Sequence, residues 1–209
     1  MITLPFTPAQ FFERFAAYHA AVGPLPLLLT ALGAGVLWLV LRAPARAGRP
    51  AALFLALLWG WAGLVYHLGF FWRINPAAPL FAALCVGAAL LFLRLGVRQG
   101  ALHFAEAGAV SRGAGAALAV FALVLYPALG PVFGHAFPAA PSFGLPCPAT
   151  LYTFGLLLMA ARPVPRALLV LPTLWAGIGG SAAFLLGVTQ DYALLAMPVV
   201  AAWLLLRRH

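Results

Sequence analysis

The stretch AALFLALLWGWAGLVYHLG, residues 51–69, decides the class of fold. It contains no Asp, Glu, Lys or Arg, and its single histidine, His67, stands near its end. A helix needs about 20 consecutive, mostly apolar residues to cross the hydrocarbon core of a bilayer. The run therefore predicts a transmembrane helix, and Arg49 before it and Arg73 after it mark its limits.

The same pattern recurs along the chain. Hydrophobic residues make up 65% of the sequence and charged residues 7%, with a mean hydropathy of +1.05, whereas soluble domains carry about 25% charged residues. We therefore predict an all-α integral membrane protein, with residues 25–209 forming a single seven-helix transmembrane bundle. The predicted spans are about 25–41, 51–69, 78–93, 113–133, 148–161, 167–188 and 192–206.

A further helix is predicted ahead of the spans, within residues 1–24. Thr7-Pro8-Ala9-Gln10 has the pattern of a capping box with proline at the first helical position. Phe11 and Phe15 follow at helical spacing. Residues 8–22 therefore predict a short amphipathic helix that lies in the membrane interface.

The basic residues predict the orientation of the bundle. The net charge of +9 comes with twelve basic residues, all of them Arg, and most stand in short gaps between apolar runs. This distribution is typical of membrane topology and argues against a nucleic-acid partner, and the absence of lysine excludes a retinal Schiff base. By the positive-inside rule, the N-terminus is outside and the C-terminus is cytoplasmic. We expect a multi-pass protein of the bacterial inner membrane, with membrane lipid as its surroundings. The arginines assigned to the cytoplasmic side are Arg42, Arg46, Arg49, Arg94, Arg98, Arg112, Arg162, Arg166, Arg207 and Arg208, and those assigned to the outside are Arg14 and Arg73.

A proline-rich segment, residues 134–148, interrupts the apolar pattern. Pro138, Pro141 and Pro146 prevent it from being helical throughout. Only 14 residues separate Cys147 from Arg162, which gives about 21 Å of helix against a hydrocarbon core of about 30 Å. The same reasoning places His67 and Asp191 below the outer surface. We predict an outward-facing, re-entrant segment that lines a polar cavity.

Four residues are candidate ligands for a zinc or copper ion in that cavity. They are His67, His135, Cys147 and Asp191, whose side chains suit a thiophilic or borderline metal. No HxxxH, CxxC or HExxH spacing supports the set. Further candidates for the cavity lining are Tyr66, Arg73, Asn75 and Gln190.

Each of the four ligand candidates also has a structural interpretation. Cys147 before Pro148 would be the N-cap of the fifth span, where the helix favours a thiolate, or a small packing residue. His67 would be an interfacial anchor and His135 a turn cap. Asp191 would cap the seventh span or pair with Arg73. Cys85 lies inside a span and is expected to pack, without a disulfide bond to the other cysteine.

Four stretches of the sequence resemble a known family. They are LPFTPAQFF (4–12), YHLGFFWRINPAA (66–78), GHAFPAAPSFGLPCPATLYTFGLLL (134–158) and GGSAAFLLGVTQD (179–191). The sequence resembles the uncharacterised bacterial membrane family catalogued as domain of unknown function 6064, over nearly its whole length. The resemblance implies a bacterial polytopic membrane protein, and it brings no activity, cofactor or catalytic residue.

Three functions fit the sequence. The first is the binding or transport of a small solute or metal ion in the outward cavity. The second is a membrane-embedded enzyme, with Cys147 as nucleophile, His135 or His67 as base and Asp191 orienting it, or with a metal-bound water as nucleophile. The third is a non-catalytic subunit or assembly factor that docks a partner membrane protein through the stiff outer segment.

Overall fold

The computed structural model describes residues 4–105, 107–161 and 163–206, and the regular structure in these ranges is helical. The α-helices are α1 (Pro8–Val22), α2 (Leu25–Arg42), α3 (Gly48–Trp61), α4 (Ala78–Leu91), α5 (Ala109–Val120), α6 (Tyr126–Ala128), α7 (Pro146–Met159), α8 (Arg166–Leu186) and α9 (Met197–Leu206). The π-helical stretches are η2 (Ala62–His67), η4 (Phe92–Arg98) and η5 (Phe121–Leu125), and the 3-10 turns are η1 (Pro44–Arg46), η3 (Phe71–Arg73), η6 (Pro131–Phe133) and η7 (Thr189–Ala196).

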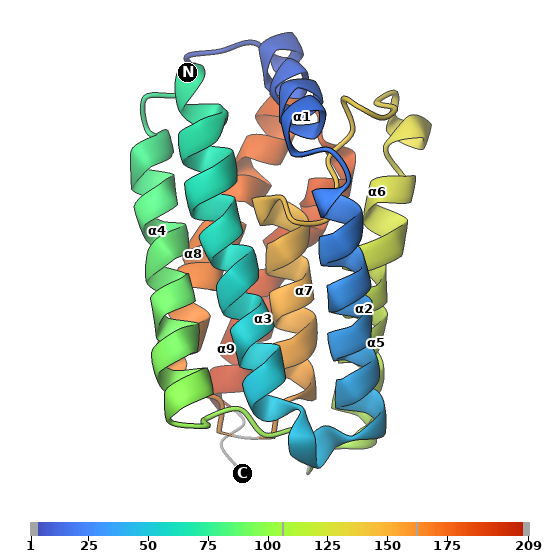
Figure 1. The fold of residues 1–209 in the computed structure, drawn as a ribbon, viewed down its shortest axis with the longest axis vertical. Coiled ribbons are helices and arrows are strands. Elements are labelled where there is room, and N and C mark those ends of the chain that lie inside the picture. The colour runs from blue at the N-terminus through green and yellow to red at the C-terminus, as the bar shows by residue number, and fades with distance from the viewer. Residues whose placement is uncertain (1–3, 106, 162, 207–209) are drawn as a thin grey trace.

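The long helices stand side by side in one bundle, and α1 crosses one of its ends (Figure 1). Within the described ranges, six helical stretches are long and apolar enough to cross a membrane. They are Leu25–Arg42, Gly48–Arg73, Ala78–Arg98, Ala109–Ala128, Arg166–Leu186 and Thr189–Leu206. They confirm the all-helical class and six of the seven predicted runs, while the run predicted at 148–161 is the shorter apolar helix α7.

Helix α1 begins as its sequence predicts. The Gln10 backbone N–H donates to Thr7 Oγ1 at 3.3 Å, and the Thr7 backbone N–H donates to Gln10 Oε1 at 2.9 Å. Pro8 takes the first helical position, where its missing N–H costs nothing. The predicted capping box is therefore confirmed.

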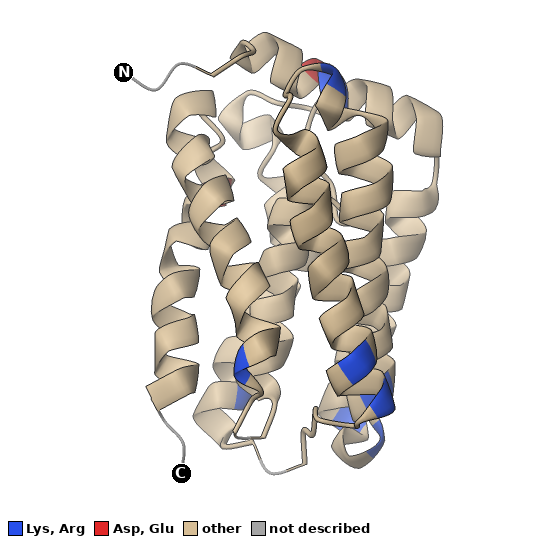
Figure 2. Cartoon of the chain, turned by 90° about the vertical axis from the view of Figure 1, so that its left-hand side faces the viewer, with Lys and Arg blue, Asp and Glu red and all other residues tan. Residues whose placement is uncertain are grey.

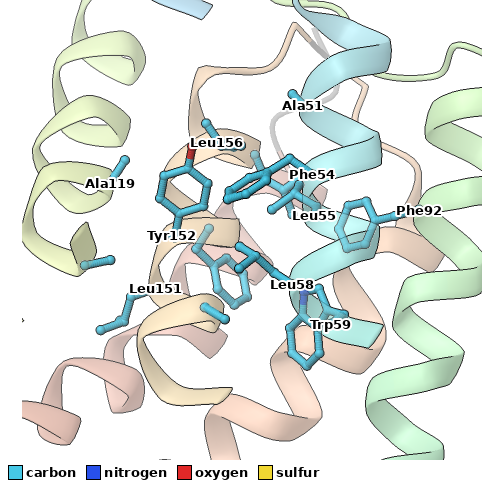
Figure 3. Packing of buried hydrophobic residues seen from close by; sticks show 14 of the residues in the cluster. Ala51, Phe54, Leu55, Leu58, Trp59, Phe92, Ala119, Leu151, Tyr152 and Leu156 are labelled. Carbon is cyan, nitrogen blue, oxygen red and sulfur yellow. The ribbon is translucent and has the colours of Figure 1, made fainter. Parts of the chain in front are cut away.

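Helix α7 lies at the centre of the bundle, and all its residues except Cys147 are buried. Glycines let it approach α5 closely: a Cβ added at Gly155 would lie 2.8 Å from the backbone oxygen of Gly115. On other sides, Tyr152 donates a hydrogen bond to the Gly33 carbonyl at 2.7 Å, and Trp59 Nε1 donates to Thr153 Oγ1 at 3.1 Å. Figure 3 shows side chains of α3, α5 and α7 meeting in this core. The other helices thus shield a helix that is short for a membrane span.

The proline-rich segment enters the bundle on its way to α7. Phe143 is 1% exposed, and its ring stacks on Phe54 at a centroid distance of 6.4 Å and meets Tyr152 edge-on at 5.3 Å. Gly144 follows with φ +101°, a conformation that favours glycine. The ring of Phe143 therefore fixes the segment inside the bundle, immediately before α7 begins at Pro146.

Arginines gather at the end of the bundle opposite α1 (Figure 2). Arg42 ends α2, Arg98 ends η4 and Arg166 begins α8. At the α1 end, the described charges include the ion pair between Glu13 and Arg14, with 3.3 Å between their charged groups. The two ends of the bundle thus differ in charge.

Candidate functional site

A cavity of about 570 Å³ lies at the end of the bundle that α1 crosses. Its walls come from the N-terminal segment with α1, from η2 and η3, from the start of α4, from α6, from the proline-rich segment with the start of α7, and from α8 and η7. The lining residues are Leu4, Phe6, Phe11, Phe15, Tyr66, His67, Phe71, Asn75, Phe81, Tyr126, Pro141, Leu145, Pro146, Cys147, Pro148, Trp175, Ile178, Gly179, Ser181, Ala182, Ala183, Phe184, Leu185, Leu186, Val188 and Asp191. Size and apolar character are both typical of small-molecule sites, which span about 300–1,000 Å³.

The π-helical stretch η2 carries Tyr66 and His67 to the cavity wall. Such stretches often occur at functional sites. His67 is 1% exposed, and its ring lies edge-on to Trp175 at 4.9 Å and to Phe71 at 5.7 Å. Among the described residues, no hydrogen-bond partner reaches either ring nitrogen of His67 or the Tyr66 hydroxyl. A buried polar atom without a partner is costly, so these groups suit a ligand that bonds to them.

Asp191 brings a carboxyl group into the same cavity. It lies in η7 and is 5% exposed. The Tyr126 hydroxyl of α6 donates a hydrogen bond to Asp191 Oδ1. The described structure contains no ion pair between Asp191 and Arg73, and the Arg73 side chain is exposed and does not line the cavity. The carboxyl group is therefore held by a neutral hydroxyl.

Cys147 lies beside this carboxyl group, but it is not the N-cap of its helix. Leu145 is the N-cap and Pro146 takes the first helical position, so α7 begins two residues earlier than predicted. Proline can take that position because its missing N–H has no partner to lose there. The Cys147 thiol interacts with Asp191, and both Cys147 Sγ and Trp175 Nε1 lie 3.5 Å from where a Cβ on Gly179 would stand.

The four predicted metal ligands do not come together. His67, Cys147 and Asp191 line the cavity, whereas His135 lies outside its lining and stacks on Phe12 of α1. Within the described ranges, no group of three or more His, Cys, Asp or Glu side chains is arranged to hold a metal ion. The neighbours of the His67 ring are the aromatic rings of Tyr66, Phe71, Phe81 and Trp175.

The other predicted residues fall in different places. Tyr66 and Asn75 line the cavity, and Asn75 Oδ1 accepts a hydrogen bond from the Ala77 backbone at 3.0 Å. Gln190 is 4% exposed but outside the lining, and no described hydrogen-bond partner reaches its amide atoms. Cys85 is fully buried, and both cysteines are free, as predicted.

Two residues of α1 that the sequence did not single out attach this helix over the cavity. His19 Nδ1 donates to the Pro138 carbonyl at 2.7 Å, and its Nε2 pairs with the Ser142 hydroxyl at 2.7 Å. Burial lowers the pKa of His19, and the bond to Pro138 opposes that change. The Tyr18 hydroxyl accepts from Trp61 Nε1 at 2.8 Å, and burial raises the Tyr18 pKa to about 12. Partners so distant in sequence leave no local signal.

Comparison with known proteins identifies the family of the chain. The model of a family of unknown function, DUF6064, matches residues 8–209, so the chain belongs to this family and the resemblance seen in its sequence is confirmed. No curated protein and no solved structure matches the chain. The function of the family is unknown, so a function for this chain must be argued from the cavity itself.

Proposed function

We propose that this DUF6064 member is a multi-pass protein of the bacterial inner membrane that binds a small solute in the cavity beneath α1, for uptake or transport. The observation that carries the proposal is the cavity of about 570 Å³ between a buried, unpaired imidazole, His67, and a buried carboxyl group, Asp191. Ionisable side chains within membrane-spanning segments mark substrate and ion pathways in many membrane proteins. Neither group has a partner of opposite charge in the described structure.

The proposal includes seven spans, with α7 as the short central one. Six helical stretches have the length and apolarity of spans, and α7 is shielded from lipid by its neighbours. Large apolar side chains face outward, including Leu27 at 74%, Trp38 at 63% and Val199 at 71% exposure. A hydrocarbon surrounding makes such exposure favourable.

The arginine-rich end faces the cytoplasm in this proposal, and the cavity faces outward. The orientation is tested with a green fluorescent protein fused to the C-terminus and, separately, with an alkaline phosphatase fused there. We expect cells with the fluorescent-protein fusion to be fluorescent, because this reporter matures in the cytoplasm. We expect cells with the phosphatase fusion to be inactive, because alkaline phosphatase becomes active only outside the cytoplasm. The reverse pattern would place the cavity on the cytoplasmic side.

Ligand binding is tested by filling the cavity from α8. Gly179 lines it, and a side chain there would lie beside Cys147 and Trp175. Gly177, two residues earlier in the same helix, has nothing within 4 Å of its Cβ position and serves as the matched control. We expect organic extracts of purified wild type and Gly177→Leu to contain a small molecule, detected by mass spectrometry, that Gly179→Leu lacks. Equal retention by Gly179→Leu would place the molecule elsewhere and reject the cavity as its site.

One contact favours a second candidate function, thiol-dependent catalysis. Cys147 stands in the first turn of α7, lines the cavity and interacts with Asp191. A helix N-terminus assists a thiolate nucleophile. Cys147→Ser separates the two functions, because it would abolish a thiol reaction but leave ligand retention intact.

A further inference from the structure

The lining of the cavity is asymmetric in charge. Among the residues that the structure describes, Asp191 is the single acidic residue of the lining, and no described arginine belongs to it. A buried charge is stabilised by a partner of opposite sign, and the described residues offer this carboxylate a tyrosine hydroxyl and a thiol instead. An anionic ligand would add a second negative charge, whereas a cationic ligand would supply the missing partner.

Aromatic rings form part of the wall of the same cavity. Trp175 meets Phe81 edge-on at a centroid distance of 5.5 Å, Phe81 stacks on Phe71 at 6.4 Å, and Phe71 stacks on Tyr66 at 5.8 Å. Trp175 lies close to Cys147, the partner of Asp191, since Trp175 Nε1 and Cys147 Sγ both lie 3.5 Å from the position of a Cβ on Gly179. Ring faces attract cations, tryptophan most strongly, and clustered rings recognise alkylated ammonium groups.

The same wall disfavours a bare inorganic cation. Sodium-like and calcium-like ions need several oxygen ligands, and the lining supplies few side-chain oxygens. Among those few, the Asn75 amide oxygen is engaged by the Ala77 backbone and the Tyr126 hydroxyl by Asp191. A cation that carries its own apolar groups does not need such ligands, since rings and aliphatic side chains replace its weakly bound water.

From these observations we infer that the cavity binds organic cations, namely an alkylated ammonium group on a small apolar framework, with Asp191 as the counter-charge and Tyr66, Phe71, Phe81 and Trp175 as the aromatic wall. The inference rests on the proposed binding function and names its ligand class. The lining reaches the outer surface of α8 at Ser181, Phe184 and Leu185, which are exposed. That edge gives the apolar framework a way in beside the helix.

The test compares three probes of similar size that differ in charge. They are benzyltrimethylammonium, its uncharged carbon isostere neopentylbenzene, and the anion 3-phenylpropionate. Binding to the full-length protein in detergent is measured by equilibrium dialysis, with protein-free detergent subtracted. We expect saturable binding of the cation at least about 30-fold tighter than that of the isostere, since losing one partner of a buried charge pair weakens binding by that factor or more.

Two variants assign the effect to the cavity. Asp191→Asn keeps the shape and removes the charge, and we expect it to bind the cation at least about 30-fold more weakly while binding the isostere unchanged. Glu13→Gln is the matched control. It also removes one of the three acidic residues of the chain, and Glu13 lies at the same end of the bundle as Asp191, but its side chain is 67% exposed. The affinity of this variant for the cation should stay at the wild-type value. Trp175→Leu provides a second test that keeps the carboxylate. It should weaken binding of the cation more than binding of the isostere.

The outcomes separate this inference from the proposed function. Equal affinity for cation and isostere, preference for the anion, or full binding by Asp191→Asn would overturn the organic-cation inference. If Gly179→Leu still loses a co-purifying molecule in that case, the binding function stands with another ligand class. If Gly179→Leu retains everything that the wild type retains, the cavity is not the binding site and both fail.

Discussion

Replacing Gly155 with alanine adds one methyl group where α7 touches α5. The new Cβ would lie 2.8 Å from the Gly115 carbonyl oxygen, 2.9 Å from the Ala119 backbone nitrogen and 3.1 Å from the Ala119 Cβ. Two of these atoms are backbone, so no side-chain rotation relieves the clash and the two helices must move apart. Overpacking costs about 1–3 kcal/mol, and we take the upper end, about 3 kcal/mol, because backbone must shift. Alanine returns about 1 kcal/mol of helix propensity, which leaves a net loss of about 2 kcal/mol.

The matched control is Gly177→Ala in α8, where nothing lies within 4 Å of the new methyl group. It should gain up to about 1 kcal/mol from helix propensity alone. Thermal unfolding of both variants in one detergent, followed by circular dichroism at 222 nm, should separate them by roughly 6–12 °C, at about 2–4 °C per kcal/mol for a chain of this size. Two variants that melt together would refute the close packing of α5 on α7, and with it the central place of α7.

Two substitutions, a change of pH and a labelling reaction test further contacts around the cavity and the core. Tyr152→Phe removes a hydrogen bond to a backbone carbonyl of α2, and we expect about 1 kcal/mol of lost stability in the same melts. His19→Phe removes two bonds to the segment 134–145, and hydrogen exchange there should become faster. Burial lowers the His19 pKa from 6.5, so its stabilising effect is complete above about pH 6.5 and is lost as the pH falls through the lowered value. The protection of the wild-type segment, that is, the slowing of its exchange relative to the intrinsic rate at the same pH, should therefore decrease in acid. N-ethylmaleimide should label Cys147, which lines the cavity, and spare Cys85, which is fully buried.

Each of these predictions has its own control. Tyr192→Phe changes a tyrosine that is 38% exposed, and it should leave the melting temperature within the scatter of repeats. His103→Phe alters an exposed histidine of the described structure, and exchange at 134–145 should not respond to it. A protection factor of the wild-type segment that does not change with pH would contradict the buried, neutral His19. Peptide mapping by mass spectrometry assigns the label, and modification of Cys85 instead would contradict the packing of α4.

The candidate site could be predicted only in part from the sequence. Cys147 and Asp191 were identified because ionisable or reactive groups are conspicuous in an apolar chain, and both line the cavity. His135 was grouped with them because it lies on the same side of the bundle, but its ring packs on α1 instead. Depth along a helix can be counted in residues, whereas the direction of a side chain depends on which helices are neighbours.

The sequence by itself determined the helical class, the runs that are apolar enough to cross a membrane and the start of α1. These features depend on composition, on helical periodicity and on partners three residues apart, such as Thr7 and Gln10. Only the tertiary structure decided that α7 lies in the centre, that Tyr126 bonds to Asp191 and that the ring of Trp175 packs edge-on against His67. Those contacts join residues far apart in the chain, and helix packing selects them from many equally apolar faces that one sequence cannot rank.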